Sequence, residues 1–99
     1  MRYTDYKFHV PEEKIVRLIV DTDAKNEADD QFAIVHALLS PKFENVGMIA
    51  AHYGTRHEDG MERSFRELET IFDKMGFPKE GMLYHGASHK IPDKSTPAV

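Results

Sequence analysis

The sequence predicts an α/β fold in which a parallel sheet is built from a β-α-β-α-β chain. Short apolar runs at residues 15–20, 46–51 and 82–85 have the composition of buried strands, and they alternate with helical patterns at residues 29–40 and 59–75. Alternating strands and helices imply parallel strands joined by right-handed crossovers. No internal repeat or low-complexity segment interrupts this order.

The first strand is expected at residues 15–20. Val16, Leu18 and Val20 point to one face of such a strand, while Ile15 and Ile19 point to the other. Both faces are therefore apolar, as in parallel sheets that are covered by helices on both sides.

The second helical segment, residues 59–75, has the clearest pattern. Its apolar residues recur at spacings of three and four, which is typical of an amphipathic helix that packs one face on a core: Met61, Phe65, Leu68, Phe72 and Met75. Asp59 and Glu62 have the spacing of a capping box, and Gly76 supplies a stop signal. The earlier helix, residues 29–40, is apolar nearly all round, so we expect it to be buried, and it must end at Ser40-Pro41.

A single α/β domain is expected over residues 1–99, with an N-terminal arm (1–14), the β-α-β-α-β core (15–87) and an irregular C-terminal segment (88–99). The pattern leaves two strand orders open. In the order 3-2-1 both helices cover the same face, so the other face would need cover from outside these 99 residues. In the order 2-1-3 each face receives one helix.

Composition excludes several classes of protein. The formal net charge of -4 and the lack of a Lys/Arg cluster disfavour nucleic-acid binding, and the absence of cysteine excludes disulfides and thiolate chemistry. No apolar segment has the length of a secretory signal or a membrane span, so we expect a cytoplasmic protein without a membrane partner. A chain of this size buries a modest core, and we expect a homo-oligomer.

Four aspartates concentrate negative charge between the first strand and the first helix: Asp21, Asp23, Asp29 and Asp30. Mutual repulsion falls if a hard divalent cation lies among them, and ligands of α/β proteins bind outside the carboxyl ends of the strands. The structural alternative is that Asp29 and Asp30 only cap the helix, while Asp21 and Asp23 are solvated turn residues. The spacings of an EF-hand, a P-loop and a dinucleotide fingerprint are absent.

Four histidines at or after strand ends match no compact zinc signature, and we interpret them as polar loop residues in or beside a pocket: His52, His57, His85 and His89.

The run IVDTDAKNEADDQFAIVHALLSP resembles the inosine-uridine-preferring nucleoside hydrolases, and the resemblance continues through GMIAAHYGT to YHGA. It implies the N-terminal part of a Rossmann-like α/β enzyme that hydrolyses the N-glycosidic bond of ribonucleosides in purine or pyrimidine salvage. The cofactor implied is Ca²⁺, with Mg²⁺ as the alternative.

The resemblance also implies roles for individual residues. Asp23 would bind the metal and take a proton from the attacking water, Asp30 would be a bidentate metal ligand, and Asp21 would support the metal shell. Asp29 would bind a ribose hydroxyl. The turn is longer than the family's common form and has Ala24-Lys25 in place of Pro-Gly. We expect this longer turn to bring Asn26 or Glu27 into the sugar site. The remaining metal ligands and the leaving-group acid are expected outside this sequence.

Two alternatives remain open. A haloacid-dehalogenase-like, Mg-dependent phosphohydrolase also has a strand ending in Asp-x-Asp, with Asp21 as nucleophile and Asp23 as acid/base. This alternative ranks lower, because it does not explain why Asp29 and Asp30 stand at the start of the predicted helix. A non-catalytic module that binds a cation or a protein partner is the second.

Overall fold

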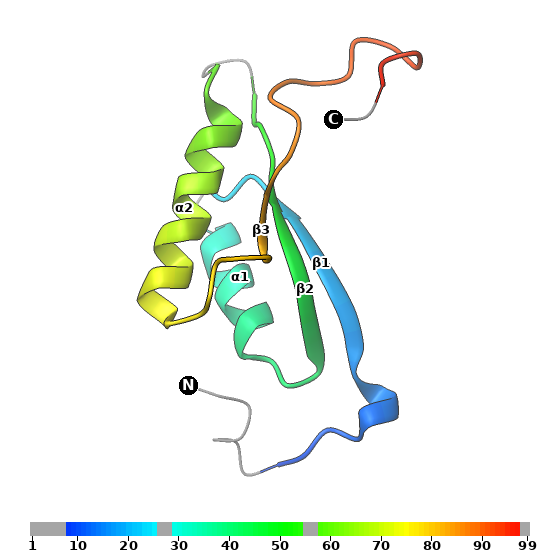
Figure 1. Ribbon diagram of the computed structural model, residues 1–99, viewed down its shortest axis with the longest axis vertical. Helices are drawn as coiled ribbons and strands as arrows, with labels where there is room; N and C mark the ends of the chain where they lie inside the picture. Colours follow the sequence, from blue (N-terminus) through cyan, green and yellow to red (C-terminus); the bar gives the residue numbers. More distant parts are fainter. Residues whose placement is uncertain (1–7, 26–28, 55–57, 98–99) are drawn as a thin grey trace.

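The computed structural model describes residues 8–25, 29–54 and 58–97 and has the predicted α/β architecture (Figure 1). A 3₁₀ turn, η2 (Glu12–Lys14), precedes five elements in the predicted order: β1 (Val16–Thr22), α1 (Asp29–Leu39), β2 (Phe43–Ala50), α2 (Gly60–Met75) and β3 (Leu83–His85). All three strands are parallel.

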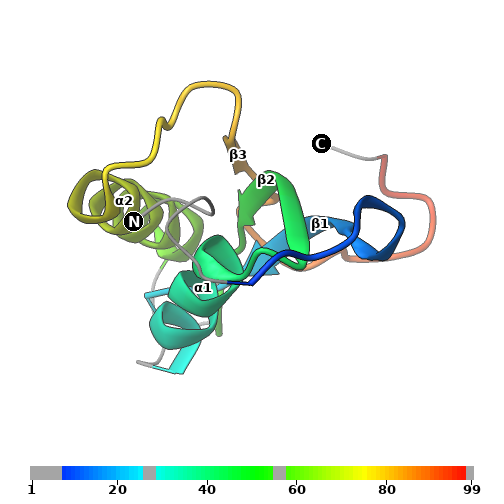
Figure 2. The ribbon, with the colours of Figure 1, turned by 90° about the horizontal axis from the view of Figure 1, so that it is seen from below.

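The sheet has the order β1-β2-β3, which decides between the two orders that the sequence left open. Both crossovers move in the same direction across the sheet, so right-handed connections place both helices on one face. Figure 2 shows α1 and α2 together on that face. Figure 2 shows no described helix on the opposite face. Ile19, 62% exposed, and Tyr84, 49% exposed, lie on that face by their strand register.

Two strand boundaries differ from the prediction by more than one residue, because pairing, and not local composition, decides them. β2 begins at Phe43 rather than Val46, since Phe43, Glu44 and Asn45 pair with the first half of β1. The register then shifts, leaving Val46 as an extra residue in β2. β1 continues to Thr22, because Asp21 and Thr22 pair with the end of β2.

The core lies between the sheet and the two helices. Its buried side chains come from the turn after β1 and from α1, β2 and α2: Ala24, Ile34, Leu38, Met48, Ala50, Leu68, Ile71 and Phe72. The Met/Phe stripe of α2 is core packing as predicted. The expectation that α1 is buried holds for one side alone: Ile34, Ala37 and Leu38 are buried, but Phe32 is 77% exposed.

The two ends of α2 differ in how well the sequence predicted them. The capping box is wrong: Asp59 precedes the helix but makes no side-chain cap hydrogen bond, and its carboxylate accepts a 2.9 Å bond from Arg63 Nε. The C-terminal stop is confirmed, since Gly76 is left-handed with φ 75°. The N–H of Phe77 then donates to the carbonyl of Phe72 at 3.0 Å, which closes the last turn.

Candidate functional site

The carboxyl ends of the three strands meet at one edge of the sheet, at the top of Figure 1. Backbone hydrogen bonds join the segments there: Ala51 N–H donates to Thr22 at 2.8 Å, and Gly86 N–H donates to Ala50 at 2.9 Å. A Cβ atom at position 86 would lie 2.6 Å from the Ala50 carbonyl oxygen, so the close approach requires glycine. This edge holds the candidate site.

Asp30 is fixed by a residue that sequence analysis did not single out. Thr22, which is buried, donates its hydroxyl to Asp30 Oδ2 at 2.8 Å. The bond joins the last residue of β1 to the first turn of α1. As a result, the Asp30 carboxylate is oriented at the helix N-terminus, where the helix dipole favours negative charge.

Asp29 lies beside it at the start of α1 and is exposed. Its Oδ1 accepts a 3.1 Å hydrogen bond from the backbone N–H of Asp30, which fits the capping alternative. Its exposure also leaves carboxylate oxygen accessible to a ligand, so the predicted contact with a ribose hydroxyl stays a prediction.

The structure separates the two aspartates of the strand end. Thr22 faces the helices, so its neighbour Asp21 projects from the opposite, open face, where its register partner is Ile49. Asp23 follows Thr22 and is half-buried, beside the fully buried Ala24.

Within the described ranges, no three His, Cys, Asp or Glu side chains converge as a metal site. Asn26 and Glu27, predicted to lie near the sugar, fall outside the described residues.

A polar clamp, formed by Lys25, Gln31 and Glu67, holds the turn against α2. Glu67 Oε1 accepts a 2.7 Å hydrogen bond from Gln31 Nε2 of α1, and Glu67 Oε2 lies 3.5 Å from Lys25 Nζ of the turn. Glu67 is far along the sequence from both partners, and no local pattern distinguishes it from the other glutamates of α2. Sequence analysis therefore missed the clamp.

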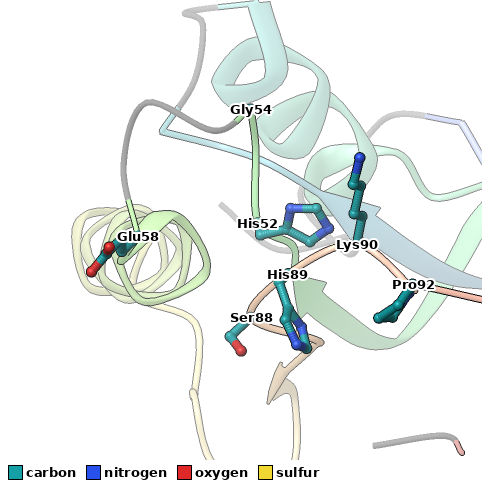
Figure 3. Close-up of a pocket in the computed structure, with 7 residues that line it drawn as sticks. All are labelled: His52, Gly54, Glu58, Ser88, His89, Lys90 and Pro92. Atoms are coloured by element: carbon teal, nitrogen blue, oxygen red, sulfur yellow. The ribbon is translucent and has the colours of Figure 1, made fainter. Parts of the chain in front are cut away.

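A cavity of about 730 Å³ opens beside the same edge, between the segment after β2 and the segment after β3 (Figure 3). His52, His89 and Lys90 line it, whereas the carboxylate of Glu58 points away from them. Nearby, hydrogen bonds from the Ser95 hydroxyl and backbone N–H hold the pKa of Asp93 below its ordinary value of 3.8.

The predicted polar role of the histidines has two outcomes. His52 and His89 line the cavity, as expected. His85 lines a different cavity, of about 440 Å³, and it also packs on α2: its ring stacks on Phe65 with centroids 3.8 Å apart, and its Nε2 lies 3.5 Å from Glu62 Oε1. It therefore ties β3 to α2. His57 is outside the described residues.

The fold and this edge define a small α/β protein whose polar residues gather at the carboxyl ends of parallel strands. Neither described helix has the length and apolar content that a membrane span requires. Comparison of the chain with protein-family models, with curated proteins and with solved structures finds no match.

Proposed function

We propose that this chain belongs to a nucleoside-hydrolase-like N-glycosidase and that its Asp21–Asp30 turn supplies part of the cation and ribose site. The observation that carries the proposal is the oriented carboxylate of Asp30, held by Thr22 at the helix N-terminus and next to the exposed Asp29. This arrangement lies at the edge where α/β proteins bind ligands.

Divalent cations such as Ca²⁺ prefer carboxylate oxygen ligands, so the chemistry of the turn fits the proposed cofactor. By position, Asp30 and Asp23 fit best, because Asp30 lies in the first turn of α1 and Asp23 directly follows the last residue of β1, at the same end of the sheet. Asp21 fits poorly, since it projects from the open face of the sheet. The cation, when bound, would hold substrate hydroxyls and favour deprotonation of a water.

The roles proposed for the chain's own residues follow the chemistry of glycoside cleavage, which passes through an oxocarbenium-like sugar and needs an activated water. Asp23 accepts the proton of that water at a carboxylate oxygen. Asp29 accepts a hydrogen bond from a ribose hydroxyl. Asp30 would help to hold the cation with its carboxylate.

Calorimetric titration of the chain with Ca²⁺ tests the cation site. We expect binding that Asp23→Ala and Asp30→Ala each weaken by about tenfold or more, because each removes a charged ligand. Asp73→Ala is the matched control: it removes an exposed carboxylate at the far end of α2. Unchanged affinity in both turn variants would contradict the proposed site.

Hydrolysis of a chromogenic riboside in the presence of Ca²⁺, by a full-length version that also supplies the remaining metal ligands and the leaving-group acid, tests the reaction. Asp23→Asn is expected to lower the rate by at least about 100-fold, the range of a lost general base, while Asp73→Asn leaves it unchanged. If a chromogenic phosphate ester is hydrolysed and the riboside is not, the phosphohydrolase alternative replaces the glycosidase.

A further inference from the structure

Glu67 of α2 binds two segments that adjoin the proposed cation site. Its Oε1 accepts a 2.7 Å hydrogen bond from Gln31 Nε2, and its Oε2 lies 3.5 Å from Lys25 Nζ. Lys25 lies in the turn two residues after Asp23, and Gln31 directly follows Asp30 in α1. The polar clamp therefore connects α2 to the chain at two points next to proposed metal ligands.

Gln31 orients the Glu67 carboxylate. It lies in the first turn of α1 beside Asp30, whose Oδ2 accepts a 2.8 Å hydrogen bond from the Thr22 hydroxyl of β1. This bond fixes the start of the helix, and Gln31 donates from that fixed position to Glu67 Oε1. With one oxygen held by α1, the other oxygen of the carboxylate faces Lys25. The Glu67 side chain is 20% exposed, so solvent screens this ion pair less than a fully exposed one.

The neighbouring charges of α2 favour the pairing of Glu67 with Lys25. Arg63 lies one turn before Glu67, at the spacing of a helical ion pair, but its Nε donates to Asp59 at 2.9 Å. Arg66 Nη2 also lies 4.0 Å from Asp59. The arginines of this stretch are thus directed toward the start of α2, and Glu67 is directed toward the turn after β1.

The charge of Lys25 matters to a cation site in this turn. Lys25 is tethered within a few residues of Asp23 and Asp29, so its ammonium is at high effective concentration for their carboxylates. An ammonium and a divalent cation compete for carboxylate oxygens, since both are attracted by the same negative charge. Glu67 neutralises the ammonium and holds it against α2. Competition from the chain's own cation is thereby reduced.

We propose that Glu67 is a positioning residue for the proposed cation site: its carboxylate, oriented by Gln31, holds the Lys25 ammonium against α2, so that this ammonium does not compete with a divalent cation at the turn. This role rests on the proposed function, because it presupposes a cation bound by the Asp21–Asp30 turn. Glu67 acts on that cation through Lys25 and not as one of its ligands.

Calorimetric titration with Ca²⁺ at physiological ionic strength tests this role. Glu67→Gln keeps an acceptor oxygen for Gln31 and removes the charge that holds Lys25. We expect the Kd for Ca²⁺ to rise roughly fivefold, because a released ammonium repels a nearby divalent ion even in water. Glu69→Gln is the matched control: it makes the same change of charge on α2, near Lys79 beyond the far end of the helix, and should alter the Kd by less than about twofold.

Removal of the ammonium separates this role from a merely structural one. Lys25→Met keeps an aliphatic stem and removes the charge. In this background Glu67→Gln is expected to change the Kd by less than about twofold, so the effects of the two substitutions are not additive. If Glu67 only packs α2, or acts only through its long-range charge, the same loss of affinity appears with and without Lys25. Additive effects would therefore overturn the proposal.

Trypsin cleavage after Lys25 measures the ion pair without any cation. A lysine that Glu67 holds enters the protease's pocket less readily, so cleavage after Lys25 should be roughly twofold to fivefold faster in Glu67→Gln, the range of a lost ion pair near the surface. Cleavage after Lys74, within α2, is the internal reference, because global unfolding accelerates both. Equal cleavage after Lys25 in the wild type and the variant overturns the proposal, since Glu67 then does not hold the lysine.

Failure of the cation site and failure of the role of Glu67 give different results. A wild-type chain that binds no Ca²⁺ contradicts the cation site itself, and with it the role of Glu67. Wild-type binding that Glu67→Gln leaves unchanged contradicts the role of Glu67 alone, and the proposed cation site stands.

Discussion

At the scale of single residues, Thr22 carries more of the candidate site than its position between two aspartates suggests. It is the inward-facing residue at the end of β1, and its hydroxyl supplies the hydrogen bond that orients Asp30. The aspartates themselves were identified from local sequence. Local sequence did not reveal that Asp21 projects from the open face while Asp30 is held on the helix side. That distinction depends on β1 continuing to Thr22, two residues beyond the apolar run.

Thr22→Val keeps the shape of the side chain and removes its hydroxyl. We expect the free energy of unfolding to fall by about 1 kcal/mol, the net value of a typical buried hydrogen bond, because Asp30 Oδ2 loses this donor. Urea unfolding followed by circular dichroism measures the change. Thr70→Val is the control: Thr70 is exposed, its hydroxyl bonds within α2 to the carbonyl of Arg66, and its loss should change stability by less than about 0.5 kcal/mol. Equal effects would contradict the role of Thr22.

At the scale of elements, α2 was predicted most closely because the information that specifies it is local. Its apolar period and Gly76 stand in one continuous stretch of sequence. The start of β2 and the clamp at Glu67 were missed because each depends on a partner that is distant in the chain. Asp59 shows a local signal being overridden, since Arg63 one turn later binds its carboxylate.

Gly76→Ala tests the C-terminal stop of α2. An added Cβ has no neighbouring atom within 4 Å, so the change acts through backbone conformation alone at φ 75°. We expect a loss of about 1 kcal/mol in the free energy of unfolding, because a side chain disfavours the left-handed region. Gly76→Asn should lose less, since asparagine tolerates this conformation. If the alanine and asparagine variants are equally stable, backbone strain is not what selects glycine here.

At the scale of the whole molecule, a single core lies on one side of a three-stranded sheet. The sequence predicted that this strand order leaves the other face bare, and Ile19 and Tyr84 are exposed there. It could not decide between the two orders, because the direction of each crossover is set by long-range pairing. Among the described residues, therefore, no second layer stabilises the sheet if the helices detach.

Leu68→Ala tests whether the molecule unfolds as one unit. Leu68 is fully buried in the cluster that joins both helices to β2, so truncation leaves a cavity and should lower the free energy of unfolding by about 3–5 kcal/mol. Because stability of small domains is only about 5–15 kcal/mol, a large share of it is lost. Phe32→Ala removes a larger side chain that is 77% exposed and should change stability by less than about 0.5 kcal/mol. Hydrogen exchange should show the amides of β1 and α2 losing protection together in Leu68→Ala. Protection that persists in β1 while α2 exchanges freely would mean that the sheet is stable without its helical layer.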